Sequence, residues 1–195
     1  MKLSLTFLIY LLLLTSGSAC IAQKNQSVDP PPPSAEYSSQ TWVEYVSDAG
    51  KFKIKFPQKP RESSEVQNGI GGQSTVYVAE HKGLLLYVTT YGDSASHIPD
   101  ARAFLRDISK GWLEANSARK LQVVKDEVIS VHSYPGHFLQ VETQQDVVRI
   151  RWIVVKDRVY YQFVAAPKHQ NALDSKNGYE RLAMGFLDSF EFTGN

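Results

Sequence analysis

From residue 41 onward the chain is a succession of short apolar segments separated by polar residues, a pattern that predicts many β-strands. The segments are rich in Val, Ile, Tyr, Phe and Thr, which favour strands. Tight turns are predicted at Asn68-Gly69 and Lys82-Gly83, because hairpins need residues that accept positive φ. The predicted strands are Trp42–Val46, Lys51–Phe56, Glu62–Gln67, Gln73–His81, Leu84–Tyr91, Lys120–Lys125, Val128–His132, His137–Thr143, Val147–Lys156 and Val159–Ala166.

Two stretches instead repeat apolar residues every three or four positions, as amphipathic helices do. The first is Pro99–Ala118, with Pro99 expected in the first turn. The second follows Asn177-Gly178, and Phe190-Glu191-Phe192 is expected to add a closing strand. The repeated apolar positions are Ala101, Phe104, Leu105, Ile108 and Trp112 in the first helix, and Tyr179, Leu182, Ala183, Phe186, Leu187 and Phe190 in the second.

The order of these elements favours an antiparallel sheet, because a parallel sheet needs a helix between most strands. We therefore predict an α+β fold in which two main helices pack on a meander-rich antiparallel sheet, within one domain of residues 41–193. Tyr134-Pro135-Gly136 is expected to form a turn in the meander. Polar turns are also expected in two similar strings, Val123–Val128 and Val154–Tyr161. The similarity is explained by shared turn chemistry or by an internal repeat.

Residues 1–22 have the pattern of a secretory signal. Lys2 precedes an apolar run from Leu3 to Leu14, and small and polar residues follow it. A helix of that length reaches only about 18 Å, well short of the roughly 30 Å hydrocarbon core of a bilayer. We interpret the segment as a removable signal, which predicts an exported protein in the periplasm or elsewhere outside the cytoplasmic membrane.

Cys20 is the only cysteine and stands where the signal should be cut, so two outcomes compete. Cleavage before Cys20 would leave it available for lipid, since Ser18-Ala19-Cys20 resembles the end of a bacterial lipobox, although Gly17 stands where that motif has Leu. Cleavage after Ala22 would release a soluble protein without cysteine. In both cases no internal disulfide forms, so the fold must depend on its core.

Residues 23–40 are predicted to be a disordered linker. Four consecutive prolines, Pro30 to Pro33, form an extended spacer of roughly 3.1 Å per residue; docking in a partner's groove is the alternative use. The chain is nearly neutral, with 21 Lys and Arg against 20 Asp and Glu, so no general attraction to nucleic acid or acidic membranes follows. Contact with a membrane is expected only through lipid on Cys20.

The sequence offers no motif for a metal, a cofactor or covalent catalysis. His132 and His137 flank the predicted turn and could approach each other, but no third ligand accompanies them, so both are expected at polar strand ends. No serine lies in a Gly-x-Ser-x-Gly motif, and Gly69-Ile70-Gly71-Gly72 is best explained as a hairpin loop. We predict no catalytic residue, metal or cofactor. A Ser/His/Asp group assembled in space would leave no such motif.

One polar face of the last hairpin is the candidate binding surface. Strand residues two apart point the same way, so Arg149, Arg151, Tyr160 and Gln162 share this face. Arginine and tyrosine are frequent contact residues. The four side chains are therefore predicted to line a shallow site for an anionic or peptide partner.

The alternative is a solvated sheet face on which the arginines pair with Glu142 or Asp146. If Asp157 and Arg158 form a two-residue turn, Arg151 lies opposite Val164, and Ile153 lies opposite Gln162. The other face of the hairpin is predicted to be core, formed by Val148, Ile150, Trp152, Val154, Tyr161 and Phe163.

Four segments together resemble small exported bacterial proteins of unassigned function whose domain has a Mog1/PsbP-type fold. They are Phe52–Pro57, Gly136–Phe138, Val159–Gln162 and Phe186–Phe190. The resemblance covers about residues 42–192. It implies this fold and a scaffold used mainly for binding. Mog1 is a nuclear transport factor and PsbP an extrinsic photosystem II subunit, but none of their partner-binding residues is matched here, so neither role carries over.

The leading functional hypothesis is a non-enzymatic envelope protein that binds another protein or a small ligand with one face of its sheet. The first alternative is a carrier that holds an apolar ligand between sheet and helix, near Trp112, Trp152 and Phe163. The second is a hydrolase with a spatially assembled site, which requires a pocket containing His132 or His137 and a hydrogen-bonded carboxylate.

Overall fold

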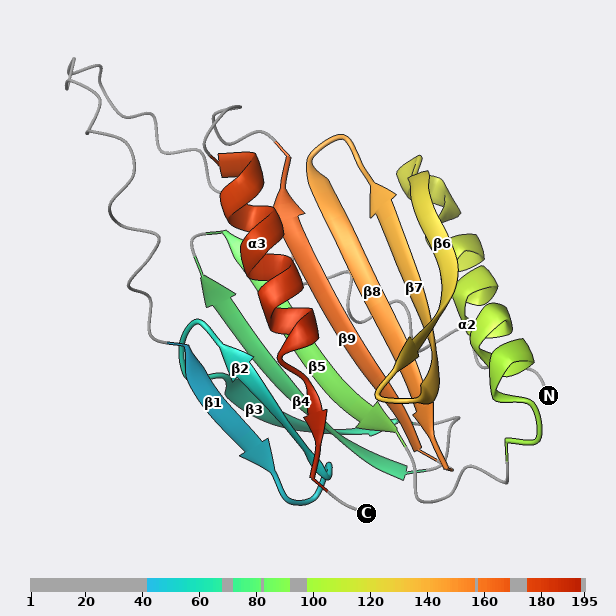
Figure 1. The fold of residues 1–195 in the computed structure, drawn as a ribbon. Helices are drawn as coiled ribbons and strands as arrows, with labels where there is room; N and C mark the ends of the chain where they lie inside the picture. Colours follow the sequence, from blue (N-terminus) through green and yellow to red (C-terminus); the bar gives the residue numbers. More distant parts are fainter. Residues whose placement is uncertain are drawn as a thin grey trace.

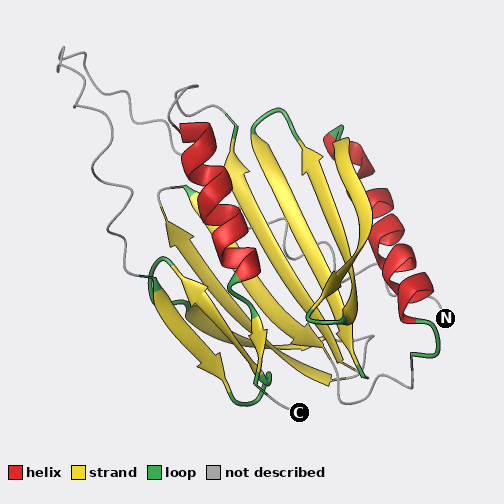
Figure 2. Cartoon of the chain, in the orientation of Figure 1, coloured by secondary structure: helices red, strands yellow, loops and turns green. Residues whose placement is uncertain are grey.

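The computed structural model describes residues 42–67, 72–81, 83–91, 98–156, 158–168 and 175–193. The predicted signal, Cys20, the proline-rich linker and the Asn68-Gly69 turn lie outside these residues. Strands dominate the described chain, and two longer helices lie beside them (Figure 2). None of the helices in these ranges is both long and apolar enough to cross a membrane.

A seven-stranded sheet forms the centre of the fold, with strand order β3-β4-β5-β9-β8-β7-β6 (Figure 1). Every neighbouring pair is antiparallel. This confirms the predicted antiparallel α+β architecture. The strands are β3 Arg61–Gln67, β4 Gly72–His81, β5 Leu84–Tyr91, β6 Gln122–Val131, β7 Tyr134–Glu142, β8 Asp146–Val155 and β9 Arg158–Pro167.

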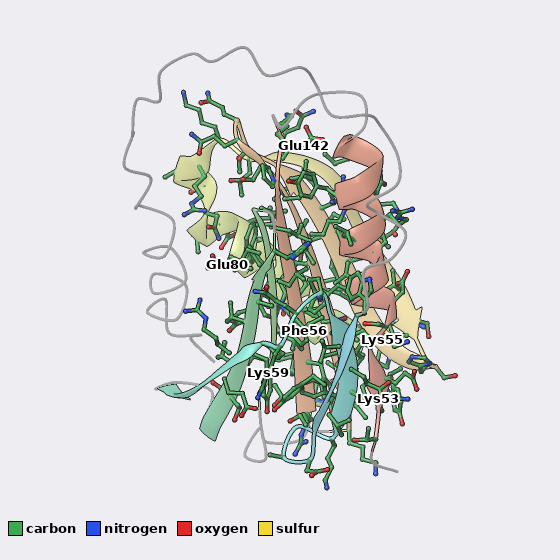
Figure 3. All side chains as sticks on the ribbon, turned by 90° about the vertical axis from the view of Figure 1, so that its left-hand side faces the viewer. Lys53, Lys55, Phe56, Lys59, Glu80 and Glu142 are labelled. Atoms are coloured by element: carbon green, nitrogen blue, oxygen red, sulfur yellow. The ribbon has the colours of Figure 1, made fainter. Side chains whose placement is uncertain are left out.

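A second, three-stranded sheet has the order β1-β2-β10. It joins the start of the domain to its end, because β10 (Glu191–Phe192) pairs with β2 (Phe52–Phe56), which also pairs with β1 (Val43–Ser47). The predicted closing strand is therefore present. Figure 3 views this side and labels Lys53, Lys55 and Lys59 along β2 and the segment after it. Lys53 is paired with Glu191 at 2.9 Å, which raises the lysine pKa.

Both predicted helices are present, as α2 (Ala101–Ala115) and α3 (Ser175–Asp188), and a short 3₁₀ turn, η2 (Ser117–Arg119), follows α2. The start of α2 differs from the prediction. Asp100 is the N-cap, and its carboxylate accepts hydrogen bonds from the backbone N–H groups of Arg102 and Ala103, both at 3.0 Å. Pro99 therefore lies before the cap, because a carboxylate satisfies the free N–H groups of a first turn.

The core consists of two apolar clusters, one on each face of the seven-stranded sheet. α3 and the small sheet cover one face, whereas α2 covers the other; in Figure 1, α3 crosses the front and α2 lies beside β6. The predicted core face of β8 and β9 is confirmed, since it packs under α2. The cluster under α3 includes Phe52, Ile54, Phe56, Leu86, Phe138, Ile153, Tyr160, Val164, Phe186, Leu187 and Phe190, and the cluster under α2 includes Leu105, Trp112, Leu139, Val141, Ile150, Trp152, Tyr161 and Phe163.

The strand β6 is longer than predicted. The string Val123–Val128 does not turn but continues as one strand with a bulge between Val123 and Lys125. The turn into β7 is instead His132-Ser133, with φ of 49° and 74°, and Tyr134-Pro135-Gly136 belongs to β7. The predicted turn was therefore wrong, because two non-glycine residues adopt the positive φ that closes this hairpin.

The hairpin of β8 and β9 turns one residue earlier than predicted. Val155 pairs with Arg158, and Lys156 has a φ of 55°. Arg151 consequently faces Gln162 rather than Val164. The pairing differs from the prediction by two residues, so every side chain keeps its predicted face.

Candidate functional site

The four residues predicted to form a binding surface do share one face of β8 and β9, but α3 covers that face. Arg149, Arg151, Tyr160 and Gln162 are all buried, Gln162 completely. The expected shallow or solvated face is therefore wrong. The cause is α3, which follows β9 in the chain and returns over the sheet. A binding role for these side chains stays a prediction.

Arg151 and Gln162 both attach the end of α3 to the sheet. The guanidinium of Arg151 donates to the carbonyl oxygen of Leu187 and to the carboxylate of Asp188, each at 2.7 Å. The side-chain amide of Gln162 donates to the same Leu187 oxygen at 3.3 Å. These contacts satisfy a helix C-terminus, whose last carbonyls have no partner within the helix.

The other two side chains also have partners inside the protein. Tyr160 donates its hydroxyl to the Gly50 carbonyl at 3.1 Å. Arg149 donates to the Gln140 side chain at 3.2 Å and lies 4.0 Å from the Glu180 carboxylate. Burial lowers the pKa of Arg149 below its usual value.

The arginines do not pair with Glu142 or Asp146 as expected, but with Glu180 and Asp188 of α3. Glu142 pairs with Lys168 at 2.6 Å instead. The carboxyl of Asp146 is half-buried, which raises its pKa. Neither carboxylate is within ion-pair distance of Arg149 or Arg151.

A groove lies between α2 and the hairpin of β6 and β7. We call it the α2–β6 groove. It consists of two hollows of about 400 and 550 Å³, both of the size that accommodates side chains or a small ligand. The hollows lie between the helix and the edge strand, and they are lined by Pro99, Asp100, Ala101, Arg102, Ile129, Ser130, Ser133 and Pro135 in the first, and by Ala103, Arg106, Asp107, Lys110, Leu113, Asp126, Val128 and His137 in the second.

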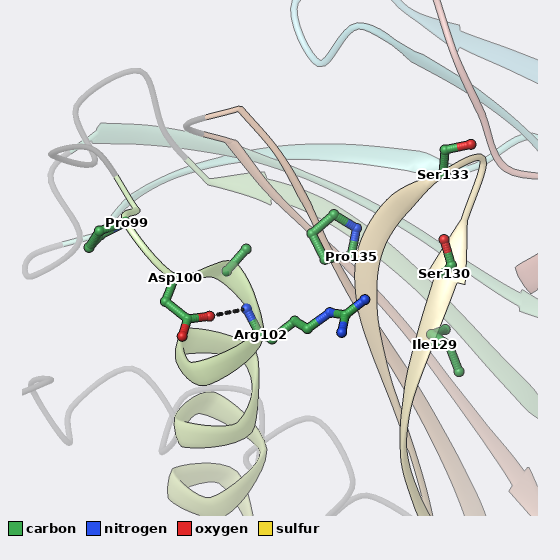
Figure 4. A pocket seen from close by; sticks show the side chains of 8 residues that line it. Pro99, Asp100, Arg102, Ile129, Ser130, Ser133 and Pro135 are labelled. Atoms are coloured by element: carbon green, nitrogen blue, oxygen red, sulfur yellow. Dashed lines mark hydrogen bonds between the residues drawn. The ribbon is translucent and has the colours of Figure 1, made fainter.

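The first hollow lies between the beginning of α2 and the end of the β6–β7 hairpin (Figure 4). Asp100 caps the helix at this point, and the side chain of Arg102 extends from the helix toward the hairpin. Pro135 and Ile129 form the strand side. This hollow therefore combines one cation with an apolar wall.

The second hollow contains a polar cluster in which the exposed Asp126 side chain contacts two buried residues. The Asp126 carboxylate accepts a hydrogen bond from the Ser109 hydroxyl at 3.3 Å and a short one from Nε2 of His137. Ser109 and His137 are buried, whereas the Asp126 side chain is 42% exposed. Nδ1 of His137 is buried without a hydrogen-bond partner among the described residues.

The two histidines are not brought together. His132 lies at the hairpin turn, where its Nε2 contacts the Phe190 carbonyl at 3.0 Å and its ring packs on Phe192. His137 instead faces α2, beside Trp152. In the ranges that the structure describes, no three His, Cys, Asp or Glu side chains are placed to hold a metal ion.

The sequence reasoning missed the residues of the Asp126 cluster. Asp126 lies in a string that resembles a turn, and Ser109 belongs to no recognisable motif. One signal was available, because Ser109 falls at helical spacing between Leu105 and Trp112 on the apolar stripe of α2. A serine on such a stripe must find a buried hydrogen-bond partner.

Comparison with known proteins supports the fold and nothing finer. Neither a family model nor a curated protein matches the chain. The solution structure of cyanobacterial PsbP (CyanoP) from Synechocystis sp. PCC 6803 is similar, with a TM-score of 0.53 and 11% identity over 83% of this chain and 98% of that one.

Two further structures are less similar. A Mog1 variant has a TM-score of 0.48 and 13% identity over 80% of this chain and 97% of its own. Protein PA94 of unknown function from Pseudomonas aeruginosa has a TM-score of 0.37 and 15% identity over 74% and 94% of the two chains. The sheet order, the two covering helices and the similarity to PsbP establish that the chain has a Mog1/PsbP-like fold.

Proposed function

We propose that the chain is an exported, non-enzymatic accessory protein of the cell envelope that binds a segment of a partner protein in the α2–β6 groove. The N-terminal sequence pattern supports export. The fold of a PsbP protein, shared at low identity, is compatible with an accessory role. The observation that carries the binding role is the groove itself.

The groove has the mixed composition of a protein-binding surface. Arg106 and Lys110 provide cations on the helix wall, and Val128 provides an exposed apolar side chain on the strand wall. The Asp126 carboxylate is held in place on this wall by Ser109. Fixed polar groups beside apolar side chains are typical of specific recognition sites.

A photo-reactive residue in the groove tests this proposal in the organism that makes the protein. Placed at Arg106 or Lys110, it should give a discrete adduct with one partner protein, recognised by mass. The control is Lys55, an exposed position on the small sheet, far from the groove in the fold. Equal adducts from Lys55, or no adduct from either groove position, would reject the binding role.

The fate of Cys20 is tested separately by the intact mass and membrane partitioning of the mature protein. A chain that starts at Cys20 and carries acyl groups would be a tethered envelope protein. A soluble chain that starts at Gln23 would be a free exported protein. A mass that retains residues 1–22 would contradict export by this signal.

A hydrolase is the second candidate, because the structure places His137 and a hydrogen-bonded carboxylate in one hollow. The order of the hydrogen bonds, from Ser109 to Asp126 to His137, favours a hydrolase less than a binding protein. The Ser109 hydroxyl donates to Asp126, whereas a nucleophilic serine needs the imidazole as its direct base. Hydrolysis of ester or peptide substrates that disappears in His137→Gln would support it over the binding role.

The carrier receives no support from the hollows. Trp112, Trp152 and Phe163 are packed in the cluster under α2, and none of them lines either hollow. Tyr161 contacts the rings of both Trp152 and Phe163. An apolar ligand would have to displace these contacts.

A further inference from the structure

The strand β6 forms one edge of the seven-stranded sheet. In the described part of the chain it pairs with β7 alone, so one side of its backbone lacks a strand partner. It runs for ten residues without proline. Long edge strands are templates for pairing with another strand, whereas a bulge and charged side chains discourage it. The strand β6 has a bulge near one end and three charged residues at its centre, so a partner strand must match those charges.

Exposed valines mark the same strand. Val123, Val124 and Val128 are 47%, 47% and 48% exposed. Isolated surface valines are common, but three on one unpaired strand form an apolar edge. A strand placed against β6 would cover these side chains.

The central residues of β6 are complementary to themselves. Residues 124–128 read Val-Lys-Asp-Glu-Val, so the charges on the two sides of Asp126 are opposite and the outer residues are both apolar. In an antiparallel pair of two β6 strands with Asp126 on the two-fold axis, Lys125 lies opposite Glu127 of the second copy. Val124 then lies opposite Val128 of the second copy.

The side-chain directions permit this register. Lys125 and Glu127 point to the face covered by α3, where the Lys125 ammonium is 2.7 Å from Glu127 and lies over the Phe138 ring. On pairing, the two copies can exchange their two exposed intrachain pairs for two equivalent pairs between copies. Asp126 points to the α2 face, where Ser109 and His137 hydrogen-bond its carboxylate and lessen the repulsion between the two copies.

We propose that the protein pairs with a second copy of itself through β6, antiparallel and centred on Asp126, to form one continuous sheet. A two-fold axis perpendicular to the sheet places both α2 helices on the same side. The bulge between Val123 and Lys125 limits regular pairing at one end of the strand. The inference goes beyond the proposed partner binding and does not depend on it.

Charge reversal tests the register. In the mature protein, Lys125→Glu places two glutamates opposite each other at both ends of the pair, and Glu127→Lys places two lysines there. Each variant should weaken self-association by about tenfold in analytical ultracentrifugation, because two attractive pairs become repulsive. An equimolar mixture of the two variants should recover the wild-type affinity, and so should the double variant K125E/E127K.

The mixture distinguishes pairing between copies from loss of the intrachain Lys125–Glu127 contact, which mixing cannot restore. A wild-type protein that stays monomeric would overturn the proposal. Self-association that the single variants leave unchanged, or that the mixture does not recover, would also overturn it, because the interface would then lie elsewhere.

A cysteine cross-link provides an independent test. Asp126→Cys should form an intermolecular disulfide under mild oxidation, because residues on the axis lie roughly 5 Å apart. Gln122→Cys, exposed on the same strand but away from the axis, is the matched control. Equal cross-linking of the two variants, or none at position 126, would contradict the register.

Discussion

Arg151 is a buried cation whose guanidinium has negatively polarised hydrogen-bond acceptors at the end of α3. Only 7% of the residue is exposed, and its guanidinium contacts Leu187 and Asp188 at the end of α3. The last carbonyls of a helix carry the negative end of its dipole. Arg151 therefore stabilises the C-terminus of α3 and fixes it on the sheet.

Replacing Arg151 with Met keeps most of the side-chain volume and removes the donors. We expect the free energy of unfolding to fall by about 2–3 kcal/mol, because the Leu187 carbonyl loses a charged donor. Urea unfolding followed by circular dichroism measures this. The control is Asp188→Asn, which alters a carboxylate that is 62% exposed and should cost less than about 1 kcal/mol. Equal costs would contradict the role of Arg151.

Tyr161 should make stability depend on alkaline pH. Burial, and the proximity of Tyr87, raise its pKa well above the usual tyrosine value, while a hydrogen bond with Trp112 acts in the opposite direction. The folded chain holds this proton more tightly than the unfolded chain, so stability is fully present below about pH 10 and is lost as the pH rises further. Tyr161→Phe should flatten this decline in urea unfolding measured from about pH 8 to 11. Identical slopes for the two proteins would reject the assignment.

Sequence alternation was sufficient to place Arg149, Arg151, Tyr160 and Gln162 on one face, because strand side chains alternate without regard to the rest of the fold. Their burial could not be predicted in the same way. It depends on α3, whose contact with Arg151 joins residues 36 positions apart. Polar alternation on a strand is equally compatible with solvent and with a helix terminus that needs donors.

At the scale of elements, the start of α2 positions one wall of the α2–β6 groove. Asp100 fixes the first turn through hydrogen bonds to Arg102 and Ala103. It also lines the first hollow. The cap therefore sets where the Arg102 side chain enters the groove.

Asp100→Ala removes this cap. We expect a loss of about 1 kcal/mol in the free energy of unfolding, because two backbone N–H groups lose their acceptor. Asp107→Ala is the control, since Asp107 is an exposed carboxylate in the middle of the same helix. Thermal unfolding of both variants is the measurement. A control that loses as much stability as Asp100→Ala would show that helix charge, rather than capping, explains the effect.

The hairpin of β6 and β7 was the element that sequence predicted least well. Lys125-Asp126-Glu127 has turn composition, but the flanking valines continue the strand through it. The real turn, His132-Ser133, contains neither Gly nor Asn, so its positive φ left no signal. The merged strand is what creates a long sheet edge and brings Asp126 to His137.

At the scale of the whole molecule, β9 connects the two sheets. Arg158 donates to the Ala49 carbonyl and Tyr160 to the Gly50 carbonyl, each at 3.1 Å, in the turn between β1 and β2. The Tyr160 ring also packs on Phe52, Phe190 and Phe192. The small sheet is also attached to β4, because the Tyr77 hydroxyl hydrogen-bonds Ser47 at 2.8 Å and the Tyr77 ring packs on Tyr45 and Phe52. On β3, Glu62 accepts a hydrogen bond from the Tyr45 hydroxyl. Such an attachment allows the small sheet to open locally while the large sheet stays folded.

Tyr160→Phe tests this arrangement, because it keeps the ring contacts and removes the hydrogen bond to Gly50. Loss of this hydrogen bond should lower the free energy of local opening of the small sheet by about 1 kcal/mol. Amide hydrogen exchange should then become roughly fivefold faster in β1 and β2 and stay unchanged in β8. Tyr134→Phe is the control, since its ring also packs on Phe192 and no hydrogen bond of its hydroxyl is described. If amide hydrogen exchange becomes as much faster in β8 as in β1, the two sheets unfold as one unit. The Tyr160 hydroxyl then stabilises the whole domain rather than the contact between the sheets.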